Sequence, residues 1–170
     1  MKSVPDQAKA DAEQEGKGRL DPVPPARGAL AYLVAKDAAR AIEWYREHFG
    51  AEVVFRLDAP SGGVMHSELR VGPAHFMLTD ECAEREALGP LTLGGSSVTV
   101  VLYVPDVDAV VARAIAGGAK PGMPVADQFW GDRSGTVTDP FGHSWFISSR
   151  KEEPSPEEIQ RRVQALYAQN

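Results

Sequence analysis

The chain has 170 residues, of which 43% are hydrophobic and 25% charged, the composition of an ordinary globular domain. Its formal net charge of −6 argues against nucleic acid or an anionic membrane as a partner. The single cysteine, Cys82, excludes an intramolecular disulfide and a cysteine-based zinc site. No stretch reaches the roughly 18 apolar residues that span a bilayer. Residues 1–27 also lack the apolar core of a signal peptide, so we expect a soluble, cytoplasmic protein.

Residues 1–27 are polar and interrupted by proline, which is typical of a tail or linker. A domain pattern begins at residue 28. An apolar run over 29–35 is followed by a helix, with Asp37 placed as its N-cap and Gly50 at its end. Three strands are expected next, over 51–59, 64–72 and 74–80, with glycine- and proline-containing turns between them. The first unit, 28–80, therefore has the order β-α-β-β-β.

The same order returns over 98–149, after a connector at 81–97 that is rich in glycine, serine and charge. An apolar run at 98–104 precedes a helix capped by Asp106 or Asp108, and three more candidate strands follow. Because one such unit cannot bury both faces of its sheet, the two units are expected to pair. We predict an α+β domain over 28–150, in which two βαβββ units form a curved, eight-stranded mixed sheet around a cavity.

The segment 151–170 predicts a C-terminal amphipathic helix. Ser155 at the N-cap, Pro156 at the first helical position and Glu158 two residues later form a capping box. The helix carries an apolar stripe that needs a partner surface, either on its own domain or on a second subunit. The stripe consists of Ile159, Val163, Leu166 and Tyr167.

Three segments together carry a resemblance to a known family: AKDAARAIEWYREHFGAEVV, VPDVDAVVARAIAGGAKP and FWGDRSGTVTDPFGHSWFIS. With the repeated unit, they resemble the vicinal oxygen chelate superfamily of glyoxalase I, extradiol dioxygenases, fosfomycin-resistance transferases and bleomycin-resistance proteins. The last segment looks most like the PhnB-like branch. The resemblance covers about residues 28–150 and implies a glyoxalase-like fold, but this superfamily keeps its scaffold while changing its chemistry.

Metal-dependent members of the superfamily place His or Glu ligands at four positions of the concave face. The resemblance matches those positions to Leu30, Thr99, Phe76 or Met77, and Phe146, where Phe146 stands in the place of a ligand Glu. A divalent metal needs imidazole, carboxylate or thiolate donors, which this set lacks. The resemblance therefore implies that the inherited metal site, and with it the cofactor, is missing.

A displaced metal site is the alternative. His66 and Glu68 share one face of a strand, and His75 lies on the next strand of the hairpin. If all three point into the cavity, they would hold a divalent metal. The favoured interpretation is a solvated polar face, on which Glu68 pairs with Arg70.

The polar segment at 132–148 separates into parts. Asp139 to Gly142 has the residues of a type I turn, and the Asp139 side chain is expected to accept backbone hydrogen bonds there. Strand alternation places His143 and Trp145 opposite to Phe146, so His143 is interpreted as a packing residue rather than an acid-base group. On the first helix, Trp44 and Tyr45 are likewise expected to pack, and His48 is expected at the surface.

Aromatic residues near Gly131 indicate a ligand site. Phe129 and Trp130 suit stacking on a flat molecule, with Asp132 and Arg133 as polar contacts. The alternative is that Trp130 packs in the core and that Asp132 and Arg133 form a turn pair. The remaining residues expected to line the cavity are Phe146 and Phe76.

We therefore predict a metal-free protein of glyoxalase fold that binds a small aromatic or cationic molecule in its cavity, as bleomycin-resistance relatives do. A homodimer is expected, although the sequence leaves open whether the units pair within one chain or between two. The alternative function is an enzyme: a metal-dependent lyase or isomerase using His66, Glu68 and His75, or a metal-free acid-base catalyst.

Overall fold

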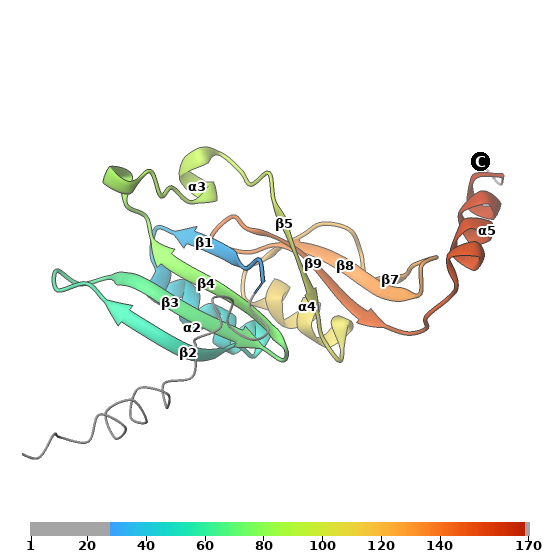
Figure 1. Ribbon diagram of the computed structural model, residues 1–170, viewed down its shortest axis with the longest axis horizontal. Coiled ribbons are helices and arrows are strands. Elements are labelled where there is room, and N and C mark those ends of the chain that lie inside the picture. Colours follow the sequence, from blue (N-terminus) through green and yellow to red (C-terminus); the bar gives the residue numbers. More distant parts are fainter. Residues whose placement is uncertain (1–27, 169–170) are drawn as a thin grey trace, which may run out of the picture.

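A computed structural model describes residues 28–168, so the predicted tail at 1–27 lies outside the described residues. The first unit forms a mixed four-stranded sheet in the order β1-β4-β3-β2, with β1 parallel to β4 (Figure 1). Its elements are β1 (Ala31–Ala35), α2 (Ala38–Phe49), β2 (Glu52–Asp58), β3 (Val64–Val71) and β4 (Ala74–Asp80).

The second unit forms a mixed five-stranded sheet in the order β5-β9-β8-β6, and β7 pairs with β8. Its elements are β5 (Thr99–Tyr103), α4 (Val107–Ala116), β6 (Lys120–Pro121), β7 (Ala126–Asp127), β8 (Asp132–Thr138) and β9 (Ser144–Arg150). The connector holds a short 3-10 helix, η1 (Ala83–Arg85), and α3 (Pro90–Leu93); the chain ends with α5 (Pro156–Tyr167).

The predicted α+β class, the duplicated unit and the C-terminal helix are confirmed, and one feature of the sheet differs. A single eight-stranded sheet was expected, but the strands form two separately hydrogen-bonded sheets. The reason is that the units meet through side chains on their helix-covered sides, where α2 packs against α4. The strands β1 and β5 are consequently edges of different sheets.

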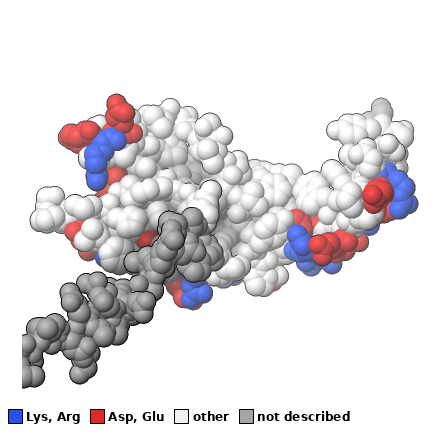
Figure 2. Space-filling view, viewed as in Figure 1, with Lys and Arg blue, Asp and Glu red and all other residues white. Residues whose placement is uncertain are grey.

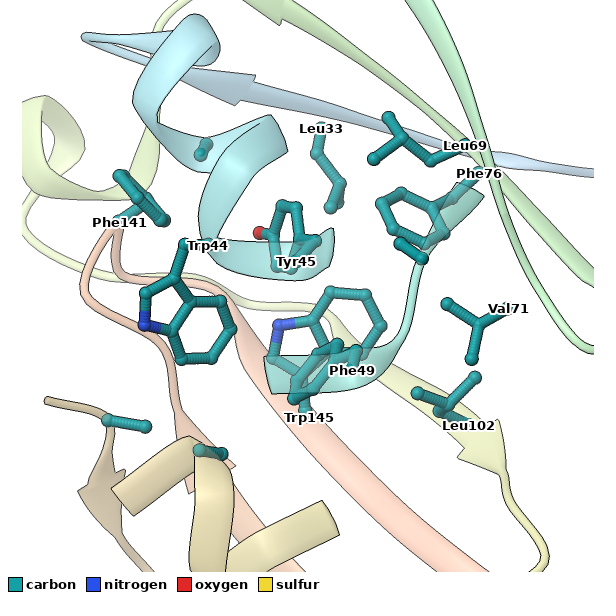
Figure 3. Packing of buried hydrophobic residues seen from close by; sticks show 14 of the residues in the cluster. Leu33, Trp44, Tyr45, Phe49, Leu69, Val71, Phe76, Leu102, Phe141 and Trp145 are labelled. Atoms are coloured by element: carbon teal, nitrogen blue, oxygen red, sulfur yellow. The ribbon is translucent and has the colours of Figure 1, made fainter. Parts of the chain in front are cut away.

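Both units share one aromatic core. The indole of Trp145 on β9 lies between rings of the first unit, with centroid separations of 5.6 Å to Tyr45, 5.0 Å to Phe49 and 5.5 Å to Phe76 (Figure 3). The indole N–H of Trp44 donates to the carbonyl of Gly117, 2.7 Å away, at the end of α4. Because aromatic side chains bury large areas, the packing of Trp145 against the first unit holds the two units in one arrangement.

The shared core corrects two predictions. Phe76 was expected in the cavity, but its side chain is 2% exposed and faces Tyr45 and Trp145. Alternation explains the error, because Met77 and not Phe76 falls on the open side of β4. His48 was expected at the surface, yet its side chain is only 15% exposed and its ring lies 5.0 Å from that of Trp44.

A buried carboxylate organises the polar part of this core. Asp139, 3% exposed, accepts hydrogen bonds from the Tyr45 hydroxyl at 2.6 Å and the Trp145 indole N–H at 2.8 Å. The backbone N–H groups of Phe141 and His143 each donate to it at 2.9 Å, as the turn predicted. Burial alone would raise the pKa of Asp139, but the contacts with His143, Tyr45 and Trp145 outweigh it and lower the pKa.

The helices begin at the capping residues that the sequence predicted. Asp37 accepts from the backbone of Arg40 at 2.9 Å, Asp106 from that of Ala109 at 3.0 Å, and Ser155 from that of Glu158 at 3.2 Å. Asp106, rather than Asp108, therefore caps the second helix. The apolar stripe of α5 is only partly covered, since no residue of that helix is fully buried. In Figure 1 this helix extends away from the two sheets.

We expect Asp139→Asn to lower the free energy of unfolding by about 2–4 kcal/mol, because an amide cannot accept hydrogen bonds from four donors at once. The folded-state pKa of Asp139 is depressed, so its contribution is present above its unfolded pKa and is lost as the pH falls through the folded value. Urea unfolding at neutral pH and at successively lower pH values measures both effects. Asp106→Asn is the control, because Asn caps a helix as well as Asp does. Equal losses of unfolding free energy in the two variants would contradict the role of Asp139 as the acceptor of four hydrogen bonds.

Candidate functional site

The open face of the five-stranded sheet, the side away from α4, carries the candidate site. Register pairs Tyr103 with Ser148, and Ser148 with Ser134, across β5, β9 and β8. The next such row joins Val101, Phe146 and Thr136. Side chains alternate across a strand, so these rows share a face opposite to the core residues Leu102, Trp145 and Val137.

Asp132 is the charged centre of this face. The residue is 5% exposed, and one carboxylate oxygen accepts from the Tyr103 hydroxyl at 2.7 Å and from the Trp130 indole N–H at 3.3 Å. Nε of Arg150 lies 4.0 Å from the other oxygen. The hydrogen bond to Asp132, followed by burial, raises the pKa of Tyr103, which keeps the phenol protonated and donating.

Aromatic side chains surround this carboxylate. The rings of Phe129 and Trp130 lie edge to face at 4.9 Å, and Trp130 lies 6.4 Å from Phe146. Gly131 makes the turn possible, since its φ is +103° and a Cβ there would lie 2.6 Å from the carbonyl oxygen of Glu152. The structure thus brings together Phe129, Trp130, Asp132 and Phe146, which the sequence proposed as ligand residues.

Arg133 does not belong to this site. Its guanidinium lies on the α4 side of the sheet, where it pairs with Asp108 at 2.7 Å and Asp127 at 3.1 Å. The prediction that Asp132 and Arg133 act together was wrong, because adjacent residues of a strand point to opposite faces. Both ion pairs raise the pKa of Arg133 further above its usual range.

A hollow of about 350 Å³ adjoins Asp132. Three carboxylates and one lysine contribute to its lining, and the carboxylates lie within ion-pair distance of Arg133, Arg150 and Arg162. Its residues are Asp127, Gln128, Gly131, Asp132, Lys151 and Glu152.

A second cavity, of about 360 Å³, lies away from the aromatic cluster, between β1, α3 and the start of β5. Its lining is mainly apolar and includes Tyr32, Pro90, Val100 and His143. The expected cavity lined by Phe129, Trp130 and Phe146 is therefore an open face in a single chain. His143 is 5% exposed and packs near the Tyr45 hydroxyl, in line with its expected packing role.

The four-stranded sheet also has an open face, opposite to Leu33, Leu69 and Leu78. The Tyr32 hydroxyl lies 2.7 Å from Nδ1 of His66, and Nε2 of His66 lies 3.8 Å from Glu68. Arg70 pairs with Glu52 on the neighbouring strand. This face is thus a chain of hydrogen-bonding and ionisable groups.

The three residues of the alternative metal site, His66, Glu68 and His75, do not come together on this face. His75 stands opposite Arg70 in the register, which places it about 13 Å along the strand from the row of His66. Among residues 28–168, no three His, Cys, Asp or Glu side chains lie close enough together to hold a metal ion. The expectation that a hairpin would bring His75 beside His66 and Glu68 was therefore wrong.

Sequence reasoning missed Tyr103 and Arg150 as members of the site. Tyr103 stood at the end of an apolar run, where it was indistinguishable from a core residue. Tyr103 points to the same side of the strand as Val101. The sequence could have indicated this only if Leu102, which lies between them, were known to face the core. Arg150 continues the alternation of Phe146 and Ser148 on β9, and its guanidinium lies 6.0 Å above the Tyr103 ring.

The geometry defines a class of protein: a duplicated βαβββ fold in which each sheet has one open face. The family model described as Glyoxalase/Bleomycin resistance protein/Dioxygenase superfamily matches residues 27–147. The chain belongs to this superfamily.

Among its relatives is an uncharacterised protein of Mycobacterium tuberculosis, 40% identical over 132 residues, which cover 76% of this chain and 78% of the relative. Similar solved structures include TioX from Micromonospora, 27% identical with a TM-score of 0.54, covering 72% of this chain and 99% of that one. An Arabidopsis thaliana gene product is 28% identical with a TM-score of 0.57, covering 72% of this chain and 98% of that one. None of the helices within residues 28–168 is long and apolar enough to cross a membrane.

We expect the purified protein to carry no stoichiometric zinc, nickel, manganese or iron. The positions that the resemblance matches to metal ligands hold Leu30, Thr99, Phe76 or Met77, and Phe146, which supply no imidazole, carboxylate or thiolate. Elemental analysis of protein purified without chelators or metal-affinity resin measures this. One metal per chain that disappears in His66→Ala would contradict the prediction.

Proposed function

We propose that this protein binds a small, planar, cationic molecule on the open face of its five-stranded sheet and sequesters it. The observation that carries the proposal is the contact of Trp130 and Tyr103 with one carboxylate, that of Asp132. From the segment GDRSGTVTDPFGHSWFIS, we also infer that the chain belongs to the PhnB-like branch of its superfamily.

The aromatic side chains would supply the attraction for a flat ring. The ring of Trp130 lies 4.9 Å from that of Phe129 and 6.4 Å from that of Phe146, and aromatic stacking favours planar ligands. A cation over the face of an indole gains a further 0.5–2 kcal/mol or so. These interactions need no catalytic group.

Charge supports a cation rather than an anion. Asp132 accepts hydrogen bonds from two neutral donors, which leave its negative charge in place. Arg150 offsets that charge only in part, because its side chain is 59% exposed and stands 4.0 Å away. The net charge of −6 acts in the same direction.

Tryptophan fluorescence tests the site directly. We expect ethidium, a planar cation, to quench Trp130 selectively, because Trp44 and Trp145 are only 8% and 0% exposed. Trp130→Leu should remove most of the saturable quenching and leave the emission of the two core indoles. Anilinonaphthalene sulfonate, a planar anion, serves as the comparison. Equal affinity for both dyes, or quenching that persists in Trp130→Leu, would overturn the proposal.

We expect Asp132→Asn to weaken ethidium binding about tenfold, the loss of one charge-assisted contact of roughly 1.4 kcal/mol. Asp108→Asn is the matched control, since it changes the net charge equally but lies on α4, where it pairs with Arg133. Titrations at low and physiological salt separate local contact from long-range attraction. An equal loss of affinity in both variants would show that general charge, not the site, governs binding.

A further inference from the structure

The imidazole of His143 has one nitrogen with polar neighbours and one without. Nδ1 lies 3.4 Å from a carboxylate oxygen of Asp139 and 3.3 Å from the hydroxyl oxygen of Tyr45. Nε2 is buried, and within residues 28–168 it has no hydrogen-bond partner. Buried polar atoms of folded proteins are nearly always hydrogen-bonded, so this nitrogen needs a partner that the described part of the chain does not supply.

The neighbours of Nδ1 decide which kind of partner Nε2 requires. The Tyr45 hydroxyl donates its only proton to Asp139 at 2.6 Å, so the phenol oxygen can only accept a second hydrogen bond. The ionised carboxylate of Asp139 is likewise an acceptor. Both groups therefore favour a proton on Nδ1, which leaves the lone pair of the neutral imidazole on Nε2. A group that binds Nε2 must donate a hydrogen bond to it.

His143 also lines the cavity of about 360 Å³ between β1, α3 and the start of β5. Apolar side chains make up much of the wall, among them Leu33, Leu88, Leu93 and Val100. None of the described lining residues is Asp, Glu, Lys or Arg. A charged ligand would therefore lose its hydration here without gaining an ion pair. The size is that of a pocket for a small organic molecule, and the lining favours a neutral one.

Close backbone contacts hold the connector over this cavity. A Cβ on Gly89 would lie 2.5 Å from the carbonyl oxygen of Val34, so the connector runs directly against β1. A Cβ on Gly142 would lie 2.9 Å from Cβ of Pro90, so the start of α3 rests on the turn before β9. The Glu81 carboxylate accepts a hydrogen bond from the backbone N–H of Gly89 at 2.8 Å. Both units and the connector thus build the cavity walls.

The surface above the cavity is uncharged. In Figure 1, α3 lies above β1, and the chain runs from α3 down into β5. In the same view, Figure 2 shows charged side chains gathered around η1 and uncharged atoms over α3. Leu93 and Val98, which also line the cavity, are 64% and 62% exposed. Because Nε2 of His143 is itself covered, a ligand reaches it when an exposed side chain such as Leu93 turns aside.

We propose that this cavity binds a second ligand, a small neutral molecule that has an apolar body and one hydroxyl group, such as a phenol or an apolar alcohol. The hydroxyl donates to Nε2 of His143, and the body lies among the apolar side chains of β1, α3 and β5. This site is independent of the proposed function, because its ligand is neutral and its lining includes none of Phe129, Trp130 and Asp132.

Two probes of the same shape test the hydrogen bond. 2-Naphthol and 2-methoxynaphthalene share a fused ring, but only the naphthol has a hydroxyl proton to donate. We expect wild-type protein to bind the naphthol about tenfold more tightly in calorimetric titrations at neutral pH, because the ether leaves Nε2 unpaired. In nitrogen NMR spectra, the Nε2 resonance of His143 should move much further with the naphthol. Equal affinities, or no binding of naphthol, would overturn the proposal.

Two leucines of α3 test the location. Leu93→Arg adds length and charge at the cavity and should weaken naphthol binding at least about tenfold. Leu91→Arg is the matched control and should not, because Leu91 is 56% exposed on the same helix but lines a different hollow. Circular dichroism verifies that both variants are folded. Unchanged binding in folded Leu93→Arg, or an equal loss in both variants, would overturn the assignment.

A third variant separates this site from the open sheet face. Loss of naphthol binding in Trp130→Leu would place the naphthol beside the aromatic cluster and would also overturn the cavity as its site. The ethidium titrations bear only on the proposed function, so the two proposals can fail separately.

Discussion

The carboxylate of Asp139 is the constraint on which the arrangement of the two units depends. It lies in a turn of the second unit, yet it accepts a hydrogen bond from Tyr45 on the first helix. A buried charge is costly unless it is hydrogen-bonded, so the turn, the Tyr45 hydroxyl and the Trp145 indole must stay together. The aromatic core around Trp145 adds apolar burial to this polar requirement.

The contact between the two units around Asp139 and Trp145 also decides which way the opposite faces of both sheets point. Since the units meet through their helix-covered sides, the faces that would line a cavity are both turned outward. The candidate site is therefore an open surface on a single chain, where Asp132 and its aromatic neighbours share one face of the five-stranded sheet. Tyr32 and His66 lie on the open face of the other sheet.

Much of the fold could be predicted from the sequence, because its causes are local. Asp37 and Ser155 cap helices through their own neighbouring backbone, and the Asp139 turn is formed by residues four apart at most. The candidate site was predictable in part: Trp130, Asp132 and Phe146 do come together. The prediction failed at Arg133 and Phe76, where one step along a strand decides between site and core.

The sequence by itself determined the duplicated βαβββ pattern and the helix boundaries, because each depends on residue type and short-range spacing. Tertiary structure alone decided that the sheets stay separate, that His75 stands far from His66, and that Tyr103 and Arg150 join Asp132. The physical reason is register. Hydrogen bonds between strands distant in sequence set which side chains become neighbours, and no local pattern records that choice.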